Sequence, residues 1–323
     1  MSSVRPLRLG TRASPLARWQ ADWVAARLAE RDVEVEMVLL TTRGDREQRG
    51  PIGGMGGQGV FTKELQRALL AGEIDLAVHS LKDLPTDAVE GLMLTAVPPR
   101  GPAGDVLVSG KASSWEALPQ GAVVGTGSLR RRTQLWHARP DLKMQDVRGN
   151  IDTRLRKLAE GQYDALILAE AGLERLGLAG EITQVLPKTL MLPAVGQGAL
   201  GLETRSDDSP TRSALVPLDD RETHAALLAE RALLATLLGG CLAPVGAWGR
   251  VEGDLLRLSA VVLSQDGVQR IAAEVAGDLA AAAELGQSAA AELLSRGAAE
   301  LIAGARQRAP GLSPPASPPS DIA

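Results

Sequence analysis

Aromatic residues and cysteine are scarce in this chain of 323 residues. With only five Trp, one Tyr and one Phe, the core must be built from aliphatic side chains. A single cysteine, Cys241, excludes an internal disulfide framework and a cysteine-based metal cluster. No apolar run approaches the roughly 20 residues of a membrane-spanning helix, and the N-terminus lacks the apolar stretch of a secretory signal. We therefore expect a water-soluble, cytoplasmic protein with no metal site.

The chain is mildly acidic overall, but its positive charge is clustered. The formal net charge of -4 argues against a general nucleic-acid-binding protein, which usually presents a basic domain or stripe. Three arginines are nevertheless adjacent at 130–132, and Arg148, Arg154 and Arg156 follow closely. One dense arginine patch on an acidic protein indicates a small anionic ligand rather than a polymer.

Strand-like and helix-like patterns alternate over the first two hundred residues. Because strands that alternate with helices favour a parallel sheet covered by helices, this half predicts an α/β fold. The glycine-rich stretch 50–59 is expected to be a mobile loop. Strands are expected at 7–10, 33–40, 74–78, 123–125, 144–147 and 165–168, and helices after Ser14 and Ser128 and at 62–71 and 152–159.

The sequence changes character from Arg221 onward. A long helix rich in Ala and Leu is expected to end at the glycines 239–240, which are a typical helix stop. Strands at 256–262 and 271–275 and an alanine-rich helix to about 306 indicate a separate, smaller α+β domain. The last residues, 310–323, hold five prolines and three serines and are expected to be disordered.

Polar residues follow the ends of four of the expected strands. Ligands of open α/β sheets bind beyond the carboxyl ends of the strands, so these side chains could surround a carboxylate-bearing ligand. Taken singly, such charged residues are usually solvated helix surface, but four coincident placements favour a binding cleft. The residues are Arg12 and Ser14, then Ser80, Lys82 and Asp83, then Thr126, Ser128, Arg130 and Arg131, and last Arg148 and Asn150.

Two of the candidate residues could carry chemistry. Asp83 could accept and return protons or stabilise a developing cation; alternatively, it forms a structural ion pair with an arginine. Cys241 follows two glycines that could place its thiol at a loop tip, although a lone cysteine is more often a buried small hydrophobe.

Six segments, in this order and spacing, resemble the porphobilinogen deaminase family. The resemblance extends from about residue 8 to about residue 306. The segments are TRASPLA at 11–17, HSLKDLP at 79–85, GTGSLRR at 125–131, RGNIDTRL at 148–155, LPAVGQGA at 192–199 and GGC at 239–241.

The resemblance implies a fold of three domains. Two are doubly wound lobes like those of periplasmic binding proteins, and the third is a small α+β domain. The implied first lobe comprises residues 1–98 together with 199–216, and the second lobe comprises 104–192. The third domain would cover 221–309 and carry Cys241, leaving 310–323 as a tail.

The resemblance also implies a transferase of tetrapyrrole biosynthesis. The family joins four porphobilinogen molecules into linear hydroxymethylbilane, with release of ammonia, on a dipyrromethane cofactor that here would be attached to Cys241 by a thioether. A monomer is expected. By position, Asp83 is the implied catalytic residue. The implied cofactor-binding residues are Lys82, Thr126, Ser128, Arg130, Arg131 and Arg154, and the implied substrate-binding residues are Arg12, Ser14, Gln20, Ser80, Arg148 and Arg175.

One part of the chain departs from the family pattern. The glycine-rich loop has Gly54 and Gln58 where the family commonly has lysines. The alternatives to the enzyme are a binding module that closes on a small anion without chemistry, and a nucleic-acid-binding protein that uses residues 130–132. The first needs no modification of Cys241, and the second predicts a steep salt dependence of binding.

Overall fold

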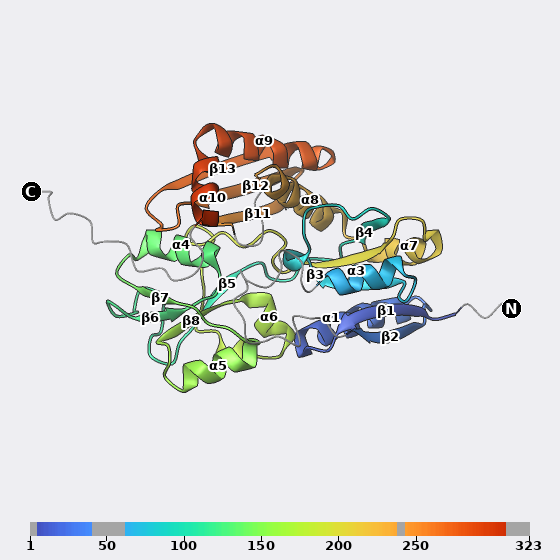
Figure 1. The fold of residues 1–323 in the computed structure, drawn as a ribbon, viewed down its shortest axis with the longest axis horizontal. Helices are drawn as coiled ribbons and strands as arrows, with labels where there is room; N and C mark the ends of the chain where they lie inside the picture. Colours follow the sequence, from blue (N-terminus) through green and yellow to red (C-terminus); the bar gives the residue numbers. More distant parts are fainter. Residues whose placement is uncertain (1–4, 41–61, 238–242, 308–323) are drawn as a thin grey trace, which may run out of the picture.

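The computed structural model describes residues 5–40, 62–237 and 243–307. Three sheets organise these residues: two have five strands and the third has three (Figure 1). Cys241, Gly54, Gln58, the expected loop at 50–59 and the expected tail at 310–323 fall outside the described residues. So do the glycines 239–240 at which the long helix was expected to end.

The first lobe is built on a sheet with the strand order β2-β1-β3-β10-β4. Helix α1 covers one face, where Leu9 and Leu76 pack against its Val24 and Leu28. Helix α3 covers the other face. The strands are β1 (Leu7–Arg12), β2 (Val35–Leu40), β3 (Leu76–Ser80), β4 (Leu92–Ala96) and β10 (Leu200–Arg205). The helices are α1 (Pro15–Ala29), α3 (Lys63–Leu70) and α7 (Ser209–Leu215), with short 3-10 turns η2 (Leu81–Asp83) and η4 (Val216–Leu218).

The second lobe repeats this plan with the strand order β7-β6-β8-β5-β9. One face packs on α4 through Leu135, and the other packs on α5 and α6 through Leu155 and Leu173. The strands are β5 (Asp105–Val108), β6 (Val123–Gly125), β7 (Lys143–Gln145), β8 (Ala165–Ala169) and β9 (Gln184–Val185). The helices are α4 (Leu129–Ala138), α5 (Ile151–Ala159) and α6 (Glu170–Arg175), followed by the turn η3 (Ala179–Glu181).

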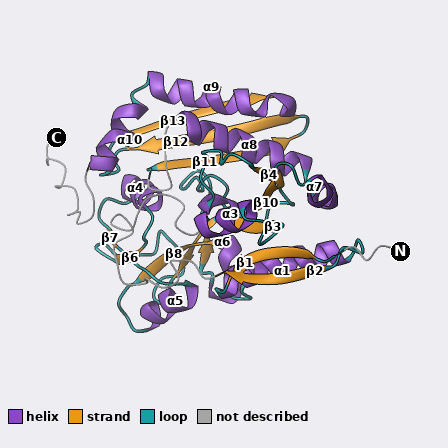
Figure 2. Cartoon of the chain, turned by 45° about the vertical axis from the view of Figure 1, so that its right-hand side comes forward, coloured by secondary structure: helices purple, strands orange, loops and turns teal. Residues whose placement is uncertain are grey.

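The expectation of parallel sheets is wrong for part of each lobe. Strand β10 runs antiparallel to both β3 and β4, and β5 runs antiparallel to both β8 and β9. Both strands follow segments that cross between the lobes: β5 (Figure 1) follows the passage from the first lobe, and β10, which lies with β3 and β4 (Figure 2), follows the return. These chain crossings reverse the strand direction, and the apolar pattern of a buried strand does not reveal it.

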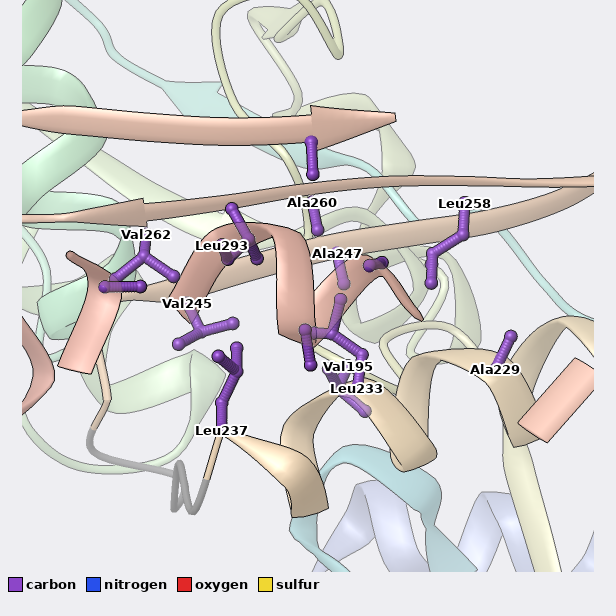
Figure 3. Close-up of a cluster of buried hydrophobic side chains, with 14 of the residues drawn as sticks. Val195, Ala229, Leu233, Leu237, Val245, Ala247, Leu258, Ala260, Val262 and Leu293 are labelled. Atoms are coloured by element: carbon purple, nitrogen blue, oxygen red, sulfur yellow. The ribbon is translucent and has the colours of Figure 1, made fainter. Parts of the chain in front are cut away.

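The third part is a three-stranded antiparallel sheet with three helices, consistent with the expected α+β domain. Its core is almost entirely Ala, Val and Leu (Figure 3). Gly286 allows α9 to approach α8 closely, because a Cβ there would meet the carbonyl oxygen of Ala229. The strands are β11 (Val245–Glu252), β12 (Leu255–Leu263) and β13 (Arg270–Gly277), and the helices are α8 (Arg221–Thr236), α9 (Ala282–Ser295) and α10 (Ala298–Gln307), with the turn η5 (Leu279–Ala281).

The single alanine-rich helix expected up to residue 306 is in fact two helices. α9 ends before Arg296, and Gly297 then adopts a φ of 93°, a left-handed conformation that glycine adopts without strain. α10 begins directly afterwards. The composition of the segment favours helix throughout, so only the glycine marks the break.

The third part contacts both lobes. On the second lobe, Gly267 approaches the backbone of α4 closely, and its carbonyl oxygen lies 2.8 Å from Nδ1 of His137. On the first lobe, Arg231 of α8 donates hydrogen bonds to the backbone carbonyl oxygens of Leu84 and Pro85. Arg100, in the segment that connects the lobes, donates a hydrogen bond of 2.6 Å from Nη1 to the buried carboxylate of Glu230 on α8. The fold class is therefore two doubly wound α/β lobes plus a small α+β domain. Among the described helices, none combines the length and apolarity that crossing a membrane requires.

Candidate active site

A pocket lies where the two lobes meet. From the first lobe, Leu16, Ser80 and Lys82 line it, and from the second lobe, Ala169 and Arg175. These residues belong to α1, to the end of β3, to η2, to the end of β8 and to the C-terminal end of α6. Ser80 and Lys82, predicted from the ends of strands, and Arg175, implied by the family resemblance, thus line one pocket.

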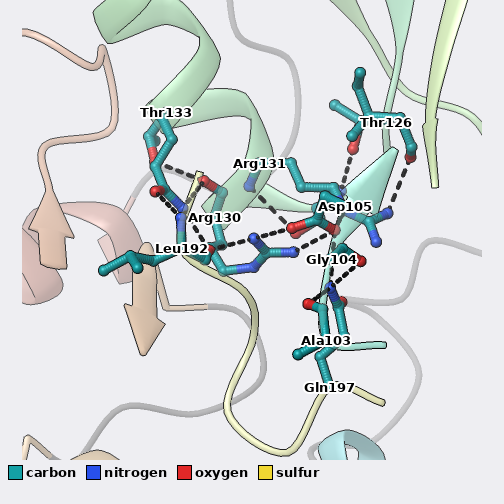
Figure 4. A network of polar contacts seen from close by, with 12 residues as sticks. Ala103, Gly104, Asp105, Thr126, Arg130, Arg131, Thr133, Leu192 and Gln197 are labelled. Atoms are coloured by element: carbon teal, nitrogen blue, oxygen red, sulfur yellow. Dashed lines mark hydrogen bonds and ion pairs between the residues drawn. The ribbon is translucent and has the colours of Figure 1, made fainter. Parts of the chain in front are cut away.

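A buried carboxylate, Asp105, organises the arginine cluster of the second lobe (Figure 4). Arg130 donates to it from Nη1 at 2.7 Å and from Nη2 at 3.1 Å, and Arg131 donates from Nε at 2.8 Å. Arg130 and Arg131 are only 4% and 7% exposed. Gln197 adds a donated hydrogen bond of 3.1 Å to the same carboxylate. Two guanidinium groups are therefore fixed in the interior of the second lobe instead of lying on the surface.

The electrostatics of this network depend on burial. Burial alone would raise the pKa of Asp105, but the charges of Arg130 and Arg131 and their hydrogen bonds hold it well below its usual range. Burial is also the main reason that the pKa of Arg131 is lowered. Arg130 and Arg131 are therefore not part of an exposed basic stripe of the kind that nucleic-acid-binding proteins usually present.

Asp105→Asn is expected to destabilise the protein strongly. Removing one partner of a buried ion pair costs about 3–5 kcal/mol, because the remaining charge stays buried. This carboxylate balances two arginines, so the loss should lower the melting temperature by roughly 5–15 °C. Since its pKa is depressed, the stabilisation is present at neutral pH and is lost only in strong acid.

The matched control is Asp141→Asn in the same lobe. Asp141 pairs with Arg139 at 2.7 Å, but both side chains are 25% exposed, so the expected loss is about 1 kcal/mol or less. Equal shifts of the melting temperature for the two variants would show that the buried ion pairs of Asp105 stabilise the fold no more than a partly exposed pair does.

Two more cations lie in the electrostatic neighbourhood of Arg131. Burial lowers the pKa of Lys82 to about 8, and the charge of Arg131 adds to this effect while Asp83 opposes it. Burial and the charge of Arg131 also lower the pKa of Arg154 to about 10. A group of cations that repel one another in this way is suited to a ligand with several carboxylates.

The first lobe contributes neutral donors and an aromatic ring. Gln20 on α1 donates a hydrogen bond of 2.7 Å to Oγ of Ser80. Arg175 reaches across from the second lobe: its Nη2 donates to the carbonyl oxygen of Gly198 at 2.6 Å, and its guanidinium lies 5.6 Å from the ring of Trp19. Burial lowers the pKa of Arg175 to about 10. Arg175 thus connects the two lobes beside the pocket.

The remaining predicted residues fall at the same edges of the sheets with different exposure. Asp83 is exposed at the end of η2, and Arg148 is exposed on the loop between β7 and α5. Thr126 is fully buried, and its Oγ1 accepts a hydrogen bond from the backbone N–H of Ser128. Ser128 caps α4 as predicted, by accepting from the backbone N–H of Arg131 at 3.4 Å. Arg12 and Ser14 are half-buried around the start of α1.

Sequence reasoning missed the buried polar residues that fix the segments around this site. Asp105, Gln197 and Glu230 are almost fully buried, and each accepts or donates hydrogen bonds between distant segments. The available signals were an acidic residue directly before the apolar run 106–108 and the position of Gln197 inside the family segment 192–199. Within the described ranges, no three His, Cys, Asp or Glu side chains converge as metal ligands would.

Comparison with known proteins places most of the chain in one family. Residues 7–213 match the family described as "Porphobilinogen deaminase, dipyromethane cofactor binding domain", and residues 224–295 match "Porphobilinogen deaminase, C-terminal domain". A solved periplasmic substrate-binding protein of an ABC transporter from Coxiella burnetii has a TM-score of 0.44 with this chain, at 16% identity, over 66% of this chain and 91% of that one.

Curated relatives match along nearly the whole length. Porphobilinogen deaminase of Trichlorobacter lovleyi is 49% identical over 87% of this chain and 90% of its own length. The enzyme of the same name from Pelotomaculum thermopropionicum is 50% identical over 87% of this chain and 91% of its own. With two family domains in order and relatives at this identity, the chain belongs to the porphobilinogen deaminase family.

Proposed function

We propose that this protein is the transferase that joins four porphobilinogen molecules into linear hydroxymethylbilane, with release of ammonia, on a dipyrromethane cofactor attached to Cys241. One observation carries the proposal. Lys82 lines the pocket between the lobes and interacts electrostatically with Asp83 and Arg131, and Arg131 in turn interacts with Arg154. Porphobilinogen carries an acetate and a propionate, so each added unit brings two carboxylates that these cations can neutralise.

The donor set fits the dipyrromethane group, which also carries carboxylates. Lys82, Ser128, Arg131 and Arg154 would hold these carboxylates, together with Thr126. Both terminal nitrogens of Arg130 donate hydrogen bonds to Asp105, and its buried Nε has no hydrogen-bond partner among the described residues. We therefore assign Arg130 a supporting role through its charge. When bound, the dipyrromethane group would supply the pyrrole to which the substrate units are added.

The other residues bind substrate and move protons. Asp83, exposed at the end of η2, would stabilise positive charge on the pyrrole nitrogen of the substrate and take up the proton that each coupling releases. The residues proposed to contact substrate or the growing product are Arg12, Ser14, Gln20, Ser80, Arg148 and Arg175.

The domain division follows the same proposal. Residues 1–98 with 199–216 form the first lobe, which is supported by the position of β10 between β3 and β4. Residues 104–192 form the second lobe, 221–309 the third domain and 310–323 a tail. We place the enzyme in the cytoplasm as a monomer that binds neither nucleic acid nor membrane.

Intact-mass measurement of the denatured protein tests the function. Protein from a host that makes porphobilinogen should be heavier than the bare chain by one dipyrromethane group. A short incubation with limiting porphobilinogen should then add a ladder of pyrrole units, while hydroxymethylbilane accumulates at longer times. A bare chain that binds porphobilinogen without adding mass would instead support the binding module without chemistry.

A further inference from the structure

Helix α8 of the third part holds the backbone that carries Asp83. Arg231 donates two hydrogen bonds to consecutive carbonyl oxygens: from Nη1 to Leu84 at 3.0 Å and from Nη2 to Pro85 at 2.7 Å. One turn earlier on α8, Leu227 is fully buried in a cluster with Leu81 and Leu84. The same face of α8 therefore contacts both ends of the turn η2.

The other side of the turn is held by the segment that returns to the first lobe. Gly196 has a φ of 75°, and a Cβ there would lie 2.9 Å from the backbone nitrogen of Lys82. The backbone N–H of Leu81 donates to the carbonyl oxygen of Ala199 at 3.0 Å. Glu230, next to Arg231 on α8, accepts from the backbone N–H of Gly196 at 2.8 Å. One helix thus fixes the turn on one side and the segment packed against it on the other.

The turn η2 has few internal contacts that could fix its conformation. η2 has only three residues, and its backbone is closed by one hydrogen bond of 3.2 Å from Leu84 N–H to the carbonyl oxygen of Leu81. Short 3-10 turns have poor hydrogen-bond geometry, so the position of Asp83 depends on contacts made from outside. A planar guanidinium can bind two carbonyl oxygens at once, which a lysine ammonium on its flexible chain cannot reproduce with the same geometry.

We propose that Arg231 is a positioning residue for Asp83. By fixing the carbonyl groups of Leu84 and Pro85, it sets where the Asp83 carboxylate sits relative to the third domain, whose helix α8 leads in sequence towards Cys241. This inference rests on the catalytic role proposed for Asp83. Misplacing a reacting group by about 1 Å can cost on the order of 100-fold in rate.

Arg231→Met tests the proposal in the cofactor-loaded enzyme, because Met keeps an apolar stem but removes both donors. With kcat normalised to the loaded fraction from intact mass, we expect kcat to fall about 10- to 100-fold while KM stays within about twofold. The kcat of Arg231→Lys should lie between those of Arg231→Met and the parent enzyme. Hydrogen exchange should become faster in peptides covering 81–86 and remain unchanged in the strands of the second lobe.

Arg296→Met is the matched control in the same domain. Arg296 also donates to a backbone carbonyl, that of Ala272 on β13 at 2.6 Å, but it follows the end of α9 and makes no such bond to the turn η2. It should leave kcat unchanged. If Arg231→Met matched this control in kcat and in exchange at 81–86, the positioning role would be excluded.

A double-mutant cycle separates this inference from the function on which it rests. If Arg231 acts through Asp83, the effects of Arg231→Met and Asp83→Glu on kcat should be clearly non-additive, whereas additive effects would contradict the proposal. Near-normal turnover by Asp83→Asn would overturn the catalytic role itself. An inactive Asp83→Asn beside a fully active Arg231→Met would overturn only the positioning role.

Discussion

Asp83→Asn is expected to lower turnover at least about 100-fold, since general acid–base catalysis contributes roughly 10²–10⁴ in rate. Asn has nearly the same shape but can neither carry the negative charge nor accept and return a proton at neutral pH. The side chain is exposed at the end of η2, so its replacement removes no buried contact. The melting temperature and the mass of the attached cofactor should therefore remain those of the parent.

The control for this variant is Asp87→Asn. Asp87 is also exposed, lies a few residues further along the chain and is not part of the proposed site. It experiences the same loss of one surface charge and should retain full turnover. Normal turnover by Asp83→Asn would remove this carboxylate from the mechanism and leave the structural ion pair as its interpretation.

Cys241→Ser is expected to abolish both the mass adduct and the formation of product. The thiolate is the nucleophilic form of cysteine, and a serine hydroxyl is far less nucleophilic at neutral pH, so no stable attachment should form. Leu237 and Ala243, which flank the segment around residue 241, are both buried in the core of the third part. The fold should therefore survive the substitution.

Two measurements decide the outcome for Cys241→Ser. Intact mass should equal that of the bare chain, and the assay for hydroxymethylbilane should show no product above background. Cys241→Ala should behave in the same way, because the sulfur and not the size of the side chain matters. Full activity in either variant would show that the growing product is not anchored at this position.

Local sequence patterns were sufficient to predict much of the fold. The apolar runs at β1, β6 and β8 and the Ser–Pro pair before α1 determine their elements locally, and these predictions are confirmed. The direction of β10 was not predictable, because a strand buried on both faces shows the same apolar pattern in either direction. Strands β4, β5, β9, β10 and β11 were not among the expected strands.

The site shows the same division between local and long-range information. Ser80 and Lys82, which were predicted from their positions after a strand, line one pocket together with Arg175, which only the family resemblance implied. The sequence could not show that Arg130 and Arg131 share Asp105, since that ion pair joins the start of α4 to the start of β5. Long-range pairing of this kind is decided by the packing of the whole lobe.

The attachment of the third part to both lobes constrains how the enzyme can accommodate a lengthening product. A wide opening of the two lobes would pull α4 away from Gly267 or separate Arg231 on α8 from the carbonyl oxygens of Leu84 and Pro85. The first loss would expose closely packed backbone, and the second would break two hydrogen bonds that a single guanidinium donates. As long as both contacts persist, room for additional pyrroles has to come from shifts of loops and side chains around the cleft.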